Sequence, residues 1–109
     1  MKEQISSSYP LYSQDGKGKD AICIVKFFFG CWTWYILEGN KENRDFMMFG
    51  IVINGMDNEY GYVSLSELEE INVRGFKIER DLYFKEKPLK DIDDDQLQAF
   101  LSSIYPDEN

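Results

Sequence analysis

The segment from Ala21 to Leu37 constrains the fold most, because β-branched and aromatic residues fill it around a single glycine, Gly30. Such residues favour extended strands, and a glycine between two strands indicates a turn. Both faces of the first half, residues 21–29, are largely apolar, which is typical of a central strand covered on each side. The segment therefore predicts a central hairpin.

The rest of the chain predicts three more strands. A charged hairpin loop over 39–45 separates the first hairpin from a strand over 46–53, which ends at the Asn54-Gly55 turn signal. A short strand over 60–64 enters a helix, and a fifth strand is expected over 81–84, where Pro88 follows.

Two helices are expected. Ser66 and Glu69, or Ser64 and Glu67 in the alternative frame, fit a capping box at the start of a short helix. Asp93 can cap a final helix, with Gln96 at the reciprocal position. Its apolar residues repeat at helical spacing and are Leu97, Phe100, Leu101 and Ile104.

The expected fold is α+β: a mainly antiparallel sheet of about five strands, with one short helix and a C-terminal helix packed on it. The length of 109 residues fits one domain. We divide it into an N-terminal arm or loop over 1–20, a core sheet domain over 21–92, and a C-terminal helix and tail of the same domain over 93–109.

The charge argues against several classes of partner. Twelve basic and twenty acidic residues give a net charge of −8. Nucleic-acid binding gains affinity by neutralising phosphates, so direct binding to nucleic acid or to an anionic membrane is not expected. A basic protein partner suits this surface better, although negative charge can also serve only solubility.

Catalytic and metal-binding residue types are scarce. The chain has no histidine, which removes the commonest general base, and its two cysteines do not make a zinc site. We expect no cofactor and no metal, and we identify no catalytic residue. Cys23 and Cys31 lie among apolar residues and are expected to be reduced, buried thiols. Residues 1–8 lack the apolar core of a signal peptide, so a cytoplasmic location is expected.

Three aromatic side chains are candidates for a partner contact. Trp32, Trp34 and Tyr35 could form a stacking platform, and tryptophan is enriched at interface hot spots. Alternating tryptophans on a strand between apolar strands are also typical of core. We expect at least one of the two tryptophans to be buried.

A charged triplet, Glu79-Arg80-Asp81, interrupts apolar sequence. Its two carboxylates share one face of an extended segment and could bind a metal or act as acid and base. The simpler interpretation is a structural ion-pair network, in which Arg80 pairs with Glu67 or Glu69. Lys26 is either an edge residue or the partner of Glu38 or Glu79.

An acidic run precedes the final helix and contains Asp93, Asp94 and Asp95. Negative charge at a helix N-terminus is favourable, which explains the run without a ligand. Together with Asp107 and Glu108, the same carboxylates could present a phosphate-like surface to a basic groove. They are therefore partner-binding candidates.

Several segments, in order, resemble a bacterial family of unknown function, domain-of-unknown-function family 2958. They are Pro10-Leu11-Tyr12-Ser13, Asp20-Ala21-Ile22 through Val25-Lys26-Phe27-Phe28, Trp32-Thr33-Trp34-Tyr35, Phe49-Gly50-Ile51-Val52, Gly61-Tyr62-Val63-Ser64-Leu65-Ser66-Glu67-Leu68-Glu69, Ile78-Glu79-Arg80-Asp81-Leu82-Tyr83-Phe84 and Lys87-Pro88-Leu89.

The resemblance covers Pro10 to about Ile92. It implies a setting in plasmids, conjugative elements and phages, near anti-restriction or replication genes, and it implies no enzyme class. The chain departs from the family pattern at Phe29-Gly30-Cys31, which is shorter and less polar, after Ile71, where it is compressed, and in the acidic final helix.

Two functional hypotheses follow. The first is a small acidic interaction protein of a mobile genetic element, which binds or inhibits a basic protein that handles nucleic acid or serves host defence. The second is a small-ligand-binding protein or enzyme that uses Glu79, Asp81 and the tryptophan face around a pocket.

Overall fold

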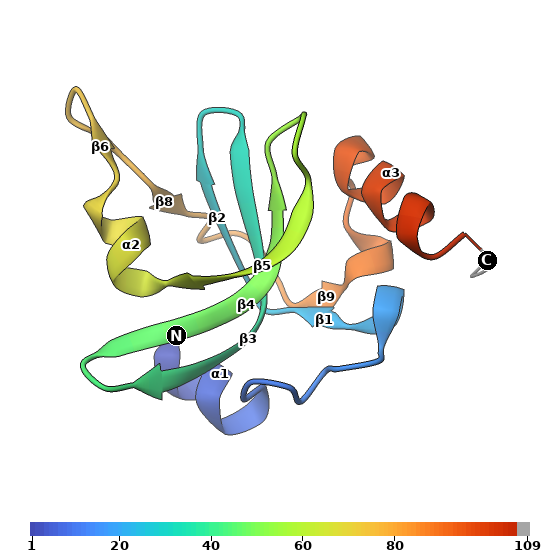
Figure 1. The fold of residues 1–109 in the computed structure, drawn as a ribbon, viewed down its shortest axis with the longest axis horizontal. Coiled ribbons are helices and arrows are strands. Elements are labelled where there is room, and N and C mark those ends of the chain that lie inside the picture. The colour runs from blue at the N-terminus through green and yellow to red at the C-terminus, as the bar shows by residue number, and fades with distance from the viewer. Residues whose placement is uncertain (107–109) are drawn as a thin grey trace.

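A five-stranded antiparallel sheet forms the centre of the computed structural model, which describes residues 1–106 (Figure 1). Its strands are β2 (Val25–Phe29), β3 (Trp32–Glu42), β4 (Asp45–Ile53), β5 (Glu59–Ser64) and β8 (Glu79–Arg80). They lie in the order β5-β4-β3-β2-β8. The expected α+β class, with its five-stranded sheet, short helix and C-terminal helix, is confirmed.

Smaller elements surround this sheet. The helices are α1 (Lys2–Ser8), α2 (Leu65–Glu70) and α3 (Asp95–Ile104), with 3-10 turns η1 (Gly18–Asp20) and η2 (Leu89–Asp91). Two short antiparallel pairs join β1 (Ile22–Cys23) to β9 (Lys87–Pro88), and β6 (Asn72–Val73) to β7 (Phe76–Lys77).

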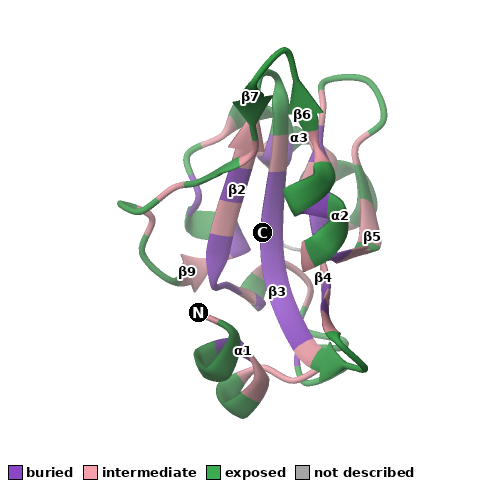
Figure 2. Cartoon of the chain, turned by 90° about the vertical axis from the view of Figure 1, so that its left-hand side faces the viewer, coloured by how far each residue is buried: buried purple, intermediate pink, exposed green. Residues whose placement is uncertain are grey.

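The central strand β3 serves two hydrophobic cores, because successive side chains of a strand point to opposite faces. Tyr35 and Leu37 face a core that α3 covers, whereas Trp34 and Ile36 face a core that α1 and α2 cover. Figure 2 shows β3 buried along most of its length. The hairpin from Ala21 to Leu37 is therefore the scaffold on which both layers of helices pack.

The N-terminal segment over 1–20 was expected to be an arm or loop. It is not a loop throughout, because residues 2–8 form α1. Ile5 is completely buried, and Met1 and Tyr9 pack on the same core. These three residues recur every four positions, which places them on one face of a helix. The tyrosine also anchors the helix end, because its carbonyl accepts a 3.0 Å hydrogen bond from the amide of Gly39.

Two predicted boundaries were wrong. The expected loop over 39–45 shrinks to a turn at Asn43 and Arg44, since β3 and β4 pair as far as Glu42 and Asp45. The predicted strand over 81–84 is a turn, and pairing with β2 occurs at Glu79–Arg80 instead. The turn has a local cause, because the Asp81 carboxylate accepts a 3.0 Å hydrogen bond from the amide of Tyr83.

The starts of α2 and α3 are each capped by a side chain. Ser64 caps α2 in a complete capping box with Glu67, so the Ser64 frame of the two proposed is the one used. Asp94, rather than the predicted Asp93, caps α3 and accepts hydrogen bonds from the amides of Gln96 at 2.9 Å and Leu97 at 3.2 Å. The one-residue shift places the capping carboxylate within reach of Tyr35 on β3, to which it bonds.

Candidate aromatic site

A pocket of about 440 Å³ lies where the segment after α1 passes the sheet, beside the end of α3. Five aromatic residues line it, and with two carboxylates they define what we call the aromatic pocket: Tyr12, Phe49, Tyr60, Tyr62, Tyr105, Asp15 and Glu38. Its volume falls within the roughly 300–1,000 Å³ typical of small-molecule sites.

The sheet supplies the ring faces. Phe49 on β4 stacks on Tyr60 of β5, with ring centroids 5.7 Å apart and planes 8° apart. It also meets its cross-strand partner Tyr62 at 4.9 Å and 52°. The hydroxyls of Tyr60 and Tyr105 are 2.9 Å apart, which ties the sheet to the residue that follows α3. The result is a wall of adjoining aromatic rings.

A β-bulge brings Glu38 to this wall. Ile36 pairs with Gly50 and Glu38 pairs with Phe49, so Leu37 is an extra residue on β3. An extra residue shifts the alternation of side chains by one position. Glu38 therefore lies on the same face as Phe49, instead of sharing the α1 and α2 face with Ile36.

The Glu38 carboxylate holds the opposite wall in place. It is 4% exposed, and its oxygens accept hydrogen bonds from the amides of Tyr12 and Gln14, each at 2.8 Å. The Gln14 side-chain amide donates to the carbonyls of Ile22 and Leu37, both at 2.7 Å. These bonds fix the chain beside β3, while the Tyr12 side chain stays 71% exposed.

The pocket carries negative charge from two carboxylates, Asp15 and Glu38. The pKa of Tyr62 is raised, first by a hydrogen bond with the Tyr12 hydroxyl and also by the nearby charges of Glu38 and Asp15. Within residues 1–106, neither carboxylate forms an ion pair; the two ion pairs found there join Lys26 to Asp81 and Lys90 to Asp20. Aromatic faces beside unpaired carboxylates are favourable surroundings for a cation.

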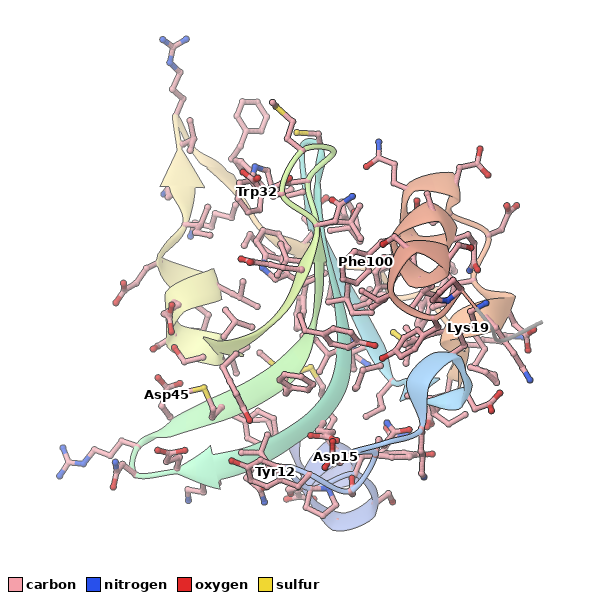
Figure 3. The ribbon with its side chains drawn as sticks, turned by 45° about the vertical axis from the view of Figure 1, so that its right-hand side comes forward. Tyr12, Asp15, Lys19, Trp32, Asp45 and Phe100 are labelled. Atoms are coloured by element: carbon pink, nitrogen blue, oxygen red, sulfur yellow. The ribbon has the colours of Figure 1, made fainter. Side chains whose placement is uncertain are left out.

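The tryptophan platform is mostly interior. Tyr35 is 1% and Trp34 is 6% exposed, so both side chains belong to the interior rather than to the surface that a partner would meet. Trp32, at 42% exposure, stacks on Trp34 with ring centroids 5.8 Å apart and can still meet a partner. Figure 3 shows Trp32 at the opposite end of the sheet from Tyr12 and Asp15, so it does not belong to the aromatic pocket.

The acidic candidates before α3 have divided roles. Asp94 caps the helix and bonds Tyr35, which gives it a structural function. Asp93 and Asp95 are exposed, and their role as partner contacts stays a prediction. Asp107 and Glu108 lie outside the described residues.

The charged triplet is not a compact network. Lys26 lies 4.0 Å from Asp81 rather than beside either of its expected partners, Glu38 and Glu79. In the described part of the chain, Arg80 is exposed and pairs with neither Glu67 nor Glu69. The Glu67 carboxylate bonds Ser64 in the capping box.

The two proposed acid and base groups have different surroundings. Glu79 lines a surface hollow beside the β6–β7 hairpin, together with Phe28, Phe29 and Phe76. Asp81 is outside the residues that line this hollow and faces Lys26 instead. The two carboxylates therefore do not share one site.

The cysteines also differ from each other. Cys23 is fully buried, and its burial raises the pKa of its thiol, whereas Cys31 is exposed, contrary to expectation. Cys31 follows Gly30 at the tip of the β2–β3 turn, beyond the reach of either core. Both thiols are free.

Sequence reasoning missed the aromatic pocket. The alternation of Tyr60 and Tyr62 signals a shared aromatic face, but no local pattern brings Tyr12 or Tyr105 to it. The bulge that turns Glu38 inward has no signal in the residues around it. These positions meet only through tertiary structure.

Two features are absent from residues 1–106. No helix in residues 1–106 is long and apolar enough to cross a membrane. Nor do three histidine, cysteine, aspartate or glutamate side chains gather there closely enough to hold a metal ion.

Comparison with known proteins gives one match. A family model described as "Protein of unknown function (DUF2958)" matches residues 4–92. The match includes every residue of the aromatic pocket except Tyr105, and it ends before α3. No curated protein and no solved structure matches the chain.

Proposed function

Given that the chain belongs to the DUF2958 family of proteins of unknown function, we propose that it is an acidic interaction protein that binds a basic protein. One observation carries the proposal: the aromatic pocket presents two carboxylates that have no cationic partner among residues 1–106. A net charge of −8 adds long-range attraction for a positively charged surface.

The proposal extends to the setting and to the class of partner. We place the protein on a mobile genetic element, where a basic target would be a nucleic-acid-handling or host-defence protein. Such a protein exposes lysine and arginine to bind phosphates, and an acidic protein can occupy the same groove. The support is the charge of the chain together with the setting that the family resemblance implies.

Affinity capture from the native host tests this function. The tagged protein should retain a basic protein at low ionic strength and release it as salt rises, since salt screens attraction between exposed charges. The control bait is an unrelated protein of equal size and net charge. Capture of no basic protein beyond that control would contradict the proposal, as would a shift of bare DNA by the purified protein at low salt.

A further inference from the structure

We infer that the aromatic pocket is a recognition site for the guanidinium group of an arginine side chain, presented by a basic polypeptide partner. The inference rests on the proposed function and deepens it by naming the side chain that the partner inserts. The rings, the charges and the hydrogen-bonding groups of the pocket each support it.

The rings suit a flat cation. Phe49 and Tyr60 are almost parallel, and Tyr62 is tilted against Phe49, so several ring faces and edges adjoin. A guanidinium group is planar and weakly hydrated, and it stacks on aromatic faces more readily than an ammonium group does. Aromatic faces attract cations through the electron density above the ring plane.

The charges suit a cation as well. Glu38 and Asp15 line the pocket, and both are close enough to influence the titration of Tyr62. Glu38 already accepts two backbone hydrogen bonds, so it contributes a fixed negative charge, whereas exposed Asp15 can turn toward a ligand. Among residues 1–106, no lysine or arginine lines the pocket. The negative charge is therefore available to an incoming cation.

The hydroxyl groups distinguish among cations. Four tyrosines line the pocket, Tyr12, Tyr60, Tyr62 and Tyr105, and a tyrosine hydroxyl oxygen can accept a hydrogen bond. A guanidinium has five N–H donors in a fixed plane, whereas a quaternary ammonium has none. The pocket therefore matches a donor-rich cation, and a quaternary ammonium would leave these oxygens without a donor from the ligand.

The Tyr12 and Tyr62 side chains come from the two walls of the pocket and lie close enough for Tyr12 to raise the pKa of Tyr62. Tyr62 is 54% exposed and Tyr12 is 71% exposed, so both side chains can rotate without disturbing either core. A ligand from outside can thus part the two rings and insert between the walls.

Binding of a short peptide, acetyl-Gly-Arg-Gly-amide, tests the inference by amide chemical shifts of the whole chain. We expect saturable shift changes confined to the pocket residues. The matched peptide with citrulline, which keeps the shape and removes the charge, should bind at least about tenfold more weakly. The peptide with lysine should also bind more weakly, because an ammonium stacks less well. Free arginine amide should bind the same residues.

Variants of the pocket sharpen the test. Tyr62→Ala and Asp15→Asn should each weaken arginine-peptide binding by roughly two- to thirtyfold, the range expected for one cation–ring contact or one charge. Tyr83→Ala and Asp57→Asn are the matched controls. Tyr83 is 94% exposed and Asp57 lies in the β4–β5 turn, and neither lines the pocket. Both controls should bind as the wild type does.

Three outcomes would overturn the inference: no shift change at the pocket at millimolar peptide, equal binding of the citrulline peptide, or tighter binding of choline than of arginine. The broader function can be judged separately. If a captured basic partner binds the Tyr12→Ala/Tyr62→Ala double variant as tightly as the wild type, the pocket assignment fails while the proposed interaction stands.

Discussion

The hydroxyl of Tyr35 donates a 2.6 Å hydrogen bond to the Asp94 carboxylate, across 59 residues of sequence. Tyr35 lies in the middle of β3, and Asp94 caps α3 through its other oxygen. One carboxylate thus holds the helix start and fixes the helix against the central strand. The bond is partly buried and its acceptor is a carboxylate, and hydrogen bonds to a charged group are stronger than neutral ones.

Removing this hydrogen bond should destabilise the protein measurably. Tyr35→Phe deletes the hydroxyl and keeps the ring, so the free energy of unfolding should fall by about 1–2 kcal/mol. Urea denaturation measures the change. Tyr83→Phe is the control, because that side chain is 94% exposed, and its effect should stay below about 0.5 kcal/mol. Equal stability of Tyr35→Phe and the wild type would show that the bond contributes nothing.

The same tyrosine predicts an alkaline loss of stability. Burial, followed by the bond to Asp94, raises the pKa of Tyr35 above its ordinary value of 10.0. The folded state therefore keeps the phenol neutral while the unfolded state ionises it. The contribution is complete below pH 10 and is lost as pH rises from there toward the raised pKa. Tyr35→Phe should lose less stability than the wild type between pH 9 and 11, and parallel losses would contradict the assignment.

Two paired glycines should respond oppositely to alanine. Gly50 and Gly61 face each other across β4 and β5. A Cβ at Gly50 would overlap the carbonyl oxygen of Tyr35, whereas a Cβ at Gly61 would meet nothing within 4 Å. Gly50→Ala should cost about 1–3 kcal/mol or prevent folding, because backbone cannot move aside cheaply.

Gly61→Ala serves as the matched control and should leave stability unchanged or raise it by up to about 1 kcal/mol, since alanine restricts the unfolded chain. Thermal denaturation compares the two variants directly. A Gly50→Ala protein as stable as Gly61→Ala would mean that β3 and β4 approach less closely than the structure shows.

Gln14 should be the most sensitive residue of the segment that forms the pocket wall. Its side chain is almost fully buried and bonds the backbone of both Ile22 and Leu37. Gln14→Ala leaves these groups without partners, at an expected cost of about 2–3 kcal/mol. Gln4→Ala is the control, because its bond to Glu86 is exposed. Hydrogen exchange of Tyr12 and Gln14 amides should speed up only in Gln14→Ala.

The two cysteines should react at very different rates with a thiol reagent. Cys31 is exposed, whereas Cys23 is buried and its pKa is raised by that burial, so little thiolate forms there. In native buffer, one thiol should react quickly, and the second should react only after denaturant is added. Cys31→Ser should abolish the fast phase. Two fast thiols in the native protein would contradict the burial of Cys23.

Local patterns predicted the elements that depend on neighbours in sequence. The aromatic and β-branched residues of β2 and β3 specify strands, and Ser64 with Glu67 specifies the start of α2. The boundary errors have local causes as well. Charged residues at the end of β3 resemble a loop, although an exposed strand end tolerates them, and the Asp81 turn competes with strand pairing.

The candidate site depends on contacts that no local pattern contains. Glu38 reaches the aromatic pocket through a bulge, and the same residue in an unbroken strand would face the opposite core. Tyr12 and Tyr62 meet because Glu38 and Gln14 fix the segment after α1 against the sheet. Two of the three aromatic partner-contact candidates, Trp34 and Tyr35, are buried because helices cover both faces of β3, and no local pattern shows that cover.

The sequence alone thus determined that residues 21–37 form a central hairpin in an α+β fold, because strand preference and glycine turns act between neighbours in the chain. Only the tertiary structure decided that this hairpin is a scaffold with the candidate site at its margin. The physical reason is that one inserted residue at Leu37 reverses the facing of Glu38, and packing against α1 and α3 sets which aromatic side chains stay exposed.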